Sequence, residues 1–233
     1  MSIQVPESSE HNIFVCKEFC LDRAIEVILL ANGEPPSQSQ TAWLREQTQP
    51  LVLTDGAANW AKEQGVTPAA IVGDFDSLNN LSYWQTQSVE IHHDPDQNTN
   101  DLHKALRAIH QQGWRRVLIL GLHGRRSDHM LANIFFISQW LPLLQLSWLD
   151  HHGLGWIAAP EEKLEAVRGR AVSLFALGDR PVTGLTTRGL VYPLDQAVLK
   201  PYTPAAALNV MQEDTAWVRH QTGTLLIYQA FQS

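Results

Sequence analysis

The stretch Ile71-Val72-Gly73-Asp74-Phe75-Asp76-Ser77 decides how we interpret the fold of this chain. Its two apolar residues mark the end of a buried strand, and two aspartates follow the glycine two positions apart. In extended backbone, residues with this spacing point the same way, so their carboxylates converge. Paired carboxylates at a strand end suit Mg²⁺, which prefers oxygen ligands. Because glycine, aspartate and serine are also turn residues, this stretch alone leaves a metal site and a simple turn open.

Strands and helices alternate on both sides of this stretch. Apolar runs predict strands at residues 25–31, 51–54, 69–72, 89–92, 117–120 and 146–149. The segments between them predict helices at residues 41–47, 57–64, 78–87, 100–111 and 130–140. Ser37 and Asn100 are expected to cap two of these helices. This alternation is typical of an α/β fold with a mostly parallel sheet and helices on both of its faces.

Polar clusters follow most of the predicted strands. They are Asn32-Gly33, Asp55-Gly56, Asp74 with Asp76, residues 94–101 and residues 124–129. In a parallel sheet, ligands bind beyond the carboxyl ends of the strands. Since aspartates recur in several of these loops, we expect one shared binding site there rather than a set of unrelated turns.

The pattern changes after Asp150. Short segments separated by glycines replace the helices, and they predict strands at residues 156–159, 172–176, 181–186, 190–192, 216–220 and 224–228. This pattern is typical of an antiparallel β-sandwich or small barrel. We therefore predict an α/β catalytic domain over residues 1–150 and a β-sandwich domain over residues 151–233.

The composition argues against several classes of protein. Lys and Arg number 17 against 24 Asp and Glu, and no basic run stands out, so we expect no nucleic-acid partner. No apolar run is long enough to span a bilayer, and the first ten residues lack the order of a signal peptide. Cys16 and Cys20 do not match a zinc motif, so we interpret them as reduced thiols of a cytoplasmic protein without a membrane partner.

The loop at residues 94–101 carries three carboxylates in front of a predicted helix. Asp101 falls in the first turn of that helix, where negative charge is favourable and where phosphate also binds. Capping does not require Asp96 or Gln97, so we regard both as ligand candidates. Lys104 lies one turn into the helix and either reaches a phosphate or is solvated on the helix surface.

A third cluster begins the helix predicted at residues 130–140. Arg126 can grip a phosphate with two hydrogen bonds, and Asp128 can bind a metal or hold the arginine in place. The role of His129 stays open, and Asn133 lies one turn further along the same face. The sequence has no Walker-type loop, Rossmann fingerprint or nucleophile elbow.

Taken in this order and spacing, the clusters resemble those of the thiamine pyrophosphokinase (thiamin diphosphokinase) family. The resemblance rests on Asn32 to Pro36, Asp55 to Asn59, Gly73 to Ser77, Asp96 to Asp101 with Lys104, and Gly124 to His129 with Asn133. It continues more loosely to the end of the chain through residues 182–194, Asn209 and residues 223–226.

The resemblance implies an enzyme that transfers the pyrophosphoryl group of ATP to the hydroxyl of thiamine, giving thiamine diphosphate and AMP. It implies Mg²⁺ as cofactor and a homodimer whose active site lies at the subunit interface. By position, Asp74, Asp76 and Asp101 would bind the metal, and these three with Asp128 would be catalytic. The implied ATP contacts are Asn32, Asp55, Asn59, Ser77, Asp96, Gln97, Lys104, Arg126, His129 and Asn133.

For thiamine, the candidates are Asn209 and Trp217. An aromatic face is an apt partner for the cationic thiazolium, although a tryptophan buried in the core is the alternative interpretation of Trp217. The chain departs from the family pattern at Ala57, Asn100, Arg125 and Leu208. The last departure lies on the thiamine side, where the family usually has a serine.

Other functions stay open at this point. The closest is the same transfer to another small alcohol, such as a hydroxymethylpterin. A non-catalytic nucleotide sensor would bind without releasing AMP. A metal-dependent phosphohydrolase would release inorganic phosphate without an acceptor.

Overall fold

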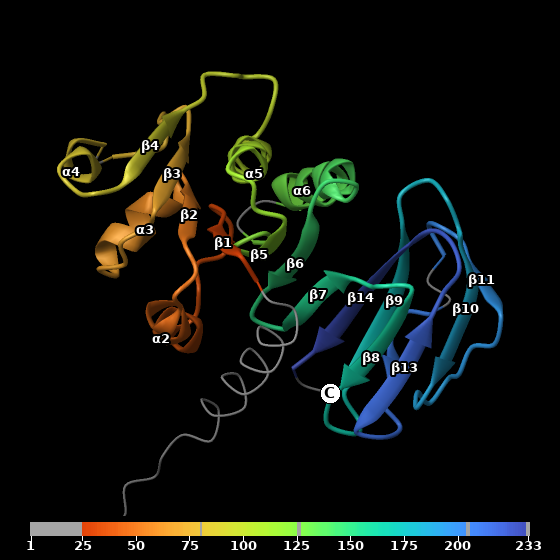
Figure 1. Ribbon diagram of the computed structural model, residues 1–233. Helices are drawn as coiled ribbons and strands as arrows, with labels where there is room; N and C mark the ends of the chain where they lie inside the picture. The colour runs from red at the N-terminus through yellow and green to blue at the C-terminus, as the bar shows by residue number, and fades with distance from the viewer. Residues whose placement is uncertain (1–24, 80, 125–126, 204–205, 232–233) are drawn as a thin grey trace, which may run out of the picture. The chain divides into compact units, whose positions relative to one another are not determined.

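The computed structural model describes residues 25–79, 81–124, 127–203 and 206–231 (Figure 1). The predictions for Cys16, Cys20 and Arg126 therefore lie outside the described residues, as does the side chain of His129. The chain divides into two compact units, one ending at His151 and the other beginning at His152. Within the described ranges, no helix has the length and apolar character needed to cross a bilayer.

The first unit is built on a parallel sheet. Its strands are β1 (Val27–Leu30), β2 (Leu51–Thr54), β3 (Ala70–Gly73), β4 (Glu90–His93), β5 (Arg116–Leu120) and β6 (Gln145–Leu149). They lie in the order β6-β5-β1-β2-β3-β4, and each neighbouring pair is parallel. Because all six strands run the same way, their carboxyl ends meet at one edge, where the predicted polar clusters follow them.

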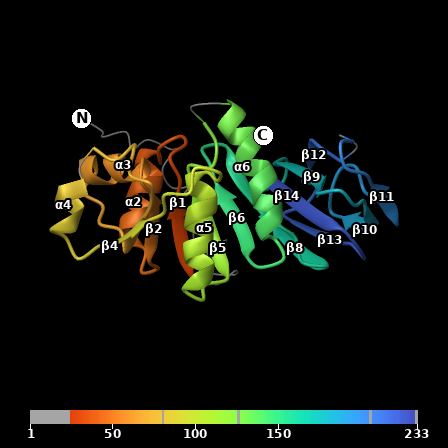
Figure 2. The ribbon, with the colours of Figure 1, turned by 90° about the horizontal axis from the view of Figure 1, so that it is seen from above.

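Helices cover both faces of this sheet, as the sequence predicts. They are α2 (Gln38–Glu46), α3 (Ala57–Glu63), α4 (Leu81–Gln85), α5 (Asp101–Gln111) and α6 (Ser127–Trp140). Figure 1 shows α2 and α3 on one side of the strands and α5 with α6 on the other, and Figure 2 shows the last two side by side. The predicted α/β architecture is therefore confirmed for this unit.

The helix caps explain where two of these helices begin. The Ser37 hydroxyl accepts a hydrogen bond from the Gln40 backbone N–H, and the Gln40 side chain in turn accepts one from the Ser37 N–H. Asn100 Oδ1 likewise accepts from the His103 backbone N–H at 2.9 Å. Such side chains satisfy donors that the first helical turn leaves without partners. Both predicted caps are confirmed, although α2 begins three residues earlier than predicted.

The second unit contains two antiparallel sheets, with strand orders β12-β9-β14-β7 and β11-β10-β13-β8. Its strands are β7 (Gly153–Ile157), β8 (Glu161–Glu165), β9 (Ala171–Leu177), β10 (Val182–Arg188), β11 (Ala197–Leu199), β12 (Asn209–Val210), β13 (Thr215–Arg219) and β14 (Thr224–Ala230). Alternate residues of both sheets are buried, as in β13 and β14, so the sheets enclose an apolar core.

Several strand predictions in this unit need correction. Strands β11 and β12 were not predicted, and β7 begins at Gly153 rather than at Trp156. Residues 190–192 form no strand, because only an isolated bridge joins Leu190 to Met211. Strand β8 was not predicted, since its sequence Glu-Glu-Lys-Leu-Glu buries only Leu164 and exposes most of its charged residues. Pairing with β13 along five residues, rather than an apolar pattern of its own, places β8 in the sheet.

Candidate metal and nucleotide site

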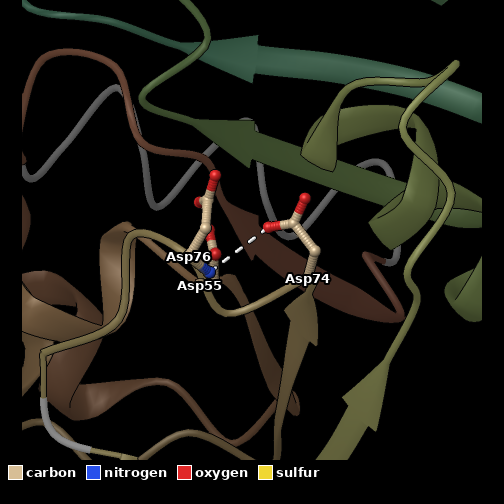
Figure 3. Close-up of side chains that lie close together, drawn as sticks. All are labelled: Asp55, Asp74 and Asp76. Carbon is tan, nitrogen blue, oxygen red and sulfur yellow. Dashed lines mark hydrogen bonds between the residues drawn. The ribbon is translucent and has the colours of Figure 1, made fainter.

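Three carboxylates meet where the neighbouring strands β2 and β3 end. One oxygen from each of Asp55, Asp74 and Asp76 lies within 4.8 Å of the others (Figure 3). Asp55 directly follows β2 and Asp74 directly follows β3, so the parallel pairing of these strands brings the two together. Asp55 is fully buried, Asp74 is partly buried and Asp76 is exposed. The group thus forms a set of oxygen ligands that is open to solvent on one side.

Backbone donors hold Asp55 in place. Its Oδ1 accepts from the Gly56 N–H at 2.5 Å and its Oδ2 accepts from the Phe75 N–H at 3.1 Å. Gly73 makes room for this side chain, because a Cβ at Gly73 would lie 2.7 Å from Asp55 Cβ. Glycine is therefore required at the end of β3 by the close approach of a neighbouring carboxylate.

The loop that carries Asp74 and Asp76 differs from the predicted extended segment. Phe75 has a φ of 66°, in the left-handed region that side chains other than glycine rarely adopt. The Asp76 N–H points back to Asp74 Oδ1 at 3.4 Å (Figure 3). The Ser77 hydroxyl donates to Asp76 Oδ1 at 2.9 Å. The two carboxylates still converge, but through a tight turn rather than through the two-residue period of a strand.

Lys104 is the counterion inside this site. Its side chain is only 2% exposed, and its Nζ lies 3.2 Å from both Asp74 Oδ2 and Asp101 Oδ1. The alternative of a solvated surface lysine is therefore wrong. Gln97 Nε2 donates to the same Asp74 oxygen at 2.8 Å. Asp74 is thus oriented by two donors that come from the 94–100 loop and from α5.

The ammonium group of Lys104 contacts two carboxylates, Asp74 and Asp101, and the carboxylate of Asp55 lies near enough to both, and to Asp76, to interact with them electrostatically. Burial is the main cause that raises the pKa of Asp55 to about 6; the nearby carboxylates of Asp101, Asp74 and Asp76 contribute to this rise, and the Gly56 hydrogen bond opposes it. A buried carboxylate that resists ionisation beside other carboxylates is a candidate ligand for a cation.

In Asp74 and Lys104, unlike in Asp55, charged and hydrogen-bonding partners outweigh burial and favour the ionised form. Burial alone would raise the pKa of Asp74, but hydrogen bonds from Gln97 and Lys104 outweigh it and lower that pKa. Burial would lower the pKa of Lys104, but Asp101 and Asp74 outweigh it and raise that pKa. Asp74 is therefore ionised at neutral pH and available as a ligand.

This donor set fits a hard divalent cation such as Mg²⁺, which takes oxygen ligands and keeps several of its waters. Asp74 and Asp76 were predicted as ligands, whereas Asp55 was expected only as an ATP contact. Asp101, also predicted as a ligand, instead contacts Lys104 and lies outside the group of three. The strand order is the signal that would have revealed Asp55, because it places the ends of β2 and β3 side by side.

Several predicted ATP contacts hold the loops around this group. Asn59 donates to the Ser77 carbonyl at 2.8 Å and accepts from the Asn79 N–H at 3.1 Å, which fixes the loop after Asp76. Asn32 lies against Gly56, since a Cβ at Gly56 would clash with the Asn32 amide. The structure therefore brings these residues to the edge of the sheet where the carboxylates gather.

The cluster at the start of α6 is described in part. Asp128 is exposed in the first turn of α6. Asn133 accepts from Asn100 Nδ2 at 2.9 Å and donates to the Leu122 carbonyl at 3.0 Å. These contacts tie the beginning of α5 to α6 and to the loop after β5. Asn133 therefore has a structural role, and its contact with ATP stays a prediction.

The two thiamine candidates lie in the second unit and have different surroundings. Asn209 is 3% exposed, and its amide donates to the Tyr192 carbonyl at 2.7 Å and accepts from the Tyr192 N–H at 3.1 Å. It therefore fixes a loop. Trp217 is 47% exposed, with Lys163 and Arg188 as its cross-strand neighbours, so the alternative of a core tryptophan is wrong. Its contact with thiamine stays a prediction.

Comparison with known proteins agrees with the resemblance noted in the sequence. Residues 41–144 match the family model described as thiamin pyrophosphokinase, catalytic domain. This segment contains the three clustered carboxylates as well as Gln97, Asp101 and Lys104. No curated protein matches the chain.

Solved structures share the fold along nearly the whole chain. Thiamine pyrophosphokinase from Bacillus subtilis has a TM-score of 0.75 at 18% identity, covering 88% of this chain and 98% of that one. Thiamin pyrophosphokinase from Candida albicans has a TM-score of 0.74 at 14% identity, covering 91% and 90%. A thiamin pyrophosphokinase family protein from Enterococcus faecalis has a TM-score of 0.71 at 23% identity, covering 88% and 98%. At these identities the similarity shows a common fold.

Proposed function

We propose that this chain, whose residues 41–144 match the catalytic domain of the thiamin pyrophosphokinase family, transfers the pyrophosphoryl group of ATP to the hydroxyl of thiamine. The products are thiamine diphosphate and AMP. The carboxylate group of Asp55, Asp74 and Asp76, inside the segment that matches the family, is the observation that carries this proposal. Transfer of this kind depends mainly on positioning and on neutralising charge at the phosphoryl oxygens.

The same three aspartates are the residues that would hold Mg²⁺ together with the phosphates of ATP. The ion would neutralise charge on the transferred group. Gln97 and Lys104 keep the Asp74 carboxylate fixed from the side of α5, while backbone N–H groups fix Asp55. Because these contacts come from the protein itself, they orient the carboxylates toward the place that the metal and the phosphates would occupy.

Lys104 and Asp101 act as a fixed pair beside the ligand oxygens. Asp101 balances the lysine from the first turn of α5, so Lys104 stays between the two carboxylates rather than reaching freely toward a phosphate. Arg126 and Asp128 are the further residues that we assign to the phosphates. Their roles rest on the family pattern.

The acceptor and the assembly remain part of the proposal. Thiamine is the acceptor that the family match supports, and Leu208 in place of the usual serine leaves another small alcohol as the alternative. A homodimer with a shared active site and a cytoplasmic location are likewise predictions. Light scattering at assay concentration tests the first of these, and a monomer would contradict the shared site.

Incubation of the purified protein with ATP, Mg²⁺ and thiamine, followed by chromatography of the products, tests the proposed reaction. We expect AMP and thiamine diphosphate in equal amounts, and only when all three components are present. Release of inorganic phosphate without an acceptor would indicate a phosphohydrolase. Bound but unchanged ATP would indicate a sensor or a different acceptor, which replacement of thiamine by a hydroxymethylpterin would reveal.

A further inference from the structure

Arg107 lies in the second turn of α5 and faces the loop that precedes this helix. Its Nη2 contacts Asp94 Oδ2 in a charged hydrogen bond and lies 3.8 Å from Asp96 Oδ2. All three side chains are only partly exposed, between 25% and 35%. One guanidinium nitrogen therefore bonds to Asp94 and lies within ion-pair distance of Asp96, so Arg107 neutralises two carboxylates of one loop.

The two aspartates in turn organise the loop at residues 94–100. Asp94 donates its N–H to the Gly73 carbonyl at 2.8 Å and accepts from the Asp96 N–H at 3.2 Å. Asp96 accepts from the Asn98 N–H at 2.9 Å and from the Thr99 hydroxyl at 3.1 Å. The shape of the loop thus depends on the carboxylates that Arg107 holds.

This loop presents Gln97 to the metal-binding carboxylates. Gln97 is itself exposed, and its side-chain Nε2 donates a hydrogen bond to Asp74 Oδ2 at 2.8 Å. An exposed side chain keeps such a contact only if its backbone is fixed, because free rotamers cost entropy. Arg107 is therefore linked to Asp74 through the 94–100 loop: it holds Asp94 and Asp96, and the same loop positions Gln97 against Asp74.

We propose that Arg107 is a positioning residue of the metal and nucleotide site, which fixes the 94–100 loop so that Gln97 orients the Asp74 carboxylate. This inference rests on the proposed function and adds a residue that does not touch the substrates. Groups that orient a metal ligand from outside typically change metal affinity or activity by about 10- to 100-fold when they are removed. Arg107 is expected to act at the lower end of this range.

A double-mutant cycle between Arg107 and Gln97 tests the inference. Arg107→Gln and Gln97→Ala should each lower kcat/KM for ATP in the presence of Mg²⁺ by about tenfold, mainly through KM. If Arg107 acts through Gln97, the double variant should lose no more than either single variant. Arg107→Lys should recover only part of the loss, because an ammonium group keeps the charge but lacks the planar geometry with which the guanidinium bonds a carboxylate.

A matched control is Arg116→Gln. Arg116 forms a comparable ion pair with Glu26 at 2.7 Å, with side chains 41% and 30% exposed, but at the beginning of β5, away from the carboxyl ends of the strands. This variant should keep kcat/KM unchanged while showing a similar small change in thermal stability. Losses that multiply in the double variant, to about 100-fold, would show that Arg107 acts independently of Gln97 and would overturn the inference.

Mn²⁺ binding without nucleotide separates this inference from the proposed reaction. Electron paramagnetic resonance should show about tenfold weaker Mn²⁺ binding in Arg107→Gln and Gln97→Ala, again without further loss in the double variant. If the wild type forms no thiamine diphosphate but this coupling is present, the proposed function fails and the role of Arg107 stands. Unchanged Mn²⁺ affinity together with unchanged KM would contradict the role of Arg107 in an active enzyme.

Discussion

Gly73 lies so close to Asp55 that a Cβ on the glycine would approach Asp55 Cβ to 2.7 Å and Asp55 Cγ to 2.8 Å. The buried carboxylate of the group is thus packed against the backbone of the strand that delivers Asp74. The position of the Asp55 carboxylate depends on the absence of a side chain one strand away. The packing of β2 beside β3 therefore determines the geometry of the carboxylate group at this contact.

Gly73→Ala should therefore displace Asp55 and weaken Mn²⁺ binding by about tenfold or more, because the ligand loses its fixed orientation. Overpacking at this position should also cost about 1–3 kcal/mol of unfolding free energy. Isothermal calorimetry and denaturant unfolding measure the two effects.

Gly65→Ala serves as the control for this change. Gly65 has a φ of 62°, and a Cβ added there would meet nothing within 4 Å, so an alanine strains the backbone without touching the site. It should lower stability by about 1 kcal/mol and leave Mn²⁺ affinity intact. Equal metal affinity in both glycine variants would contradict the proposed role of the Gly73 contact.

Asp74→Asn and Asp76→Asn should each lower turnover by about 10²-fold or more, since each removes charge that stabilises the transition state. Thermal unfolding should change little in Asp76→Asn, because Asp76 is exposed, and more in Asp74→Asn, because the buried Lys104 loses one of its two charged partners. Asp179→Asn, an exposed change in the second unit, is the control and should leave turnover unaltered. Turnover near that of the wild type in both site variants would remove these residues from the metal site.

Lys104→Met tests the role of the internal counterion. The variant leaves Asp74 and Asp101 without their shared cation, so we expect a loss of about 1–3 kcal/mol in unfolding free energy, limited by the partial exposure of both carboxylates. Added Mg²⁺ should then raise the melting temperature of the variant more than that of the wild type, because the ion replaces part of the missing charge. An equal effect of Mg²⁺ on both proteins would show that Lys104 does not balance the metal-binding carboxylates.

The raised pKa of Asp55 makes both the stability of the fold and its stabilisation by Mg²⁺ depend on pH. Between the ordinary value of 3.8 and about 6, the folded protein binds more protons at Asp55 than the unfolded chain, so this group makes stability fall as pH rises. Above about 6 the carboxylate is ionised and available to a cation. Stabilisation by Mg²⁺ should therefore be larger at neutral pH than near pH 5.

Melting temperatures with and without MgCl₂ across this pH range check the expectation. Asp55→Asn provides the comparison. Because an amide does not titrate, this substitution should remove most of the pH dependence of the Mg²⁺ effect on the melting temperature. An effect of Mg²⁺ that is the same at both ends of the range in the wild type would contradict the assignment of Asp55 as a ligand.

The sequence was sufficient to predict those elements whose structure depends on the local residue pattern. The continuous apolar run at Leu51–Thr54 is the strand β2 with the predicted bounds, and the caps at Ser37 and Asn100 are formed as predicted. Strand β8 could not be predicted, because its charged residues carry no apolar signal and its place depends on pairing with β13. Strands with an apolar pattern and helix caps can therefore be predicted from the sequence, whereas pairing between distant segments cannot.

The site shows the same distinction. Asp74 and Asp76 were identified from their spacing, but the left-handed backbone at Phe75 that brings them together has no sequence signal. Asp55 joins them because β2 and β3 are neighbours, which only the strand order reveals. The burial of Lys104 likewise depends on how α5 packs against the sheet.

The most direct test of the proposed reaction follows the labelled β-phosphate of ATP in the presence of Mg²⁺ and thiamine. Pyrophosphoryl transfer predicts that this label moves into thiamine diphosphate while an α-phosphate label stays in AMP. The Asp74→Asn variant should form both products at least about 10²-fold more slowly. A β-phosphate label that is released as inorganic phosphate or remains in ADP would contradict the central claim.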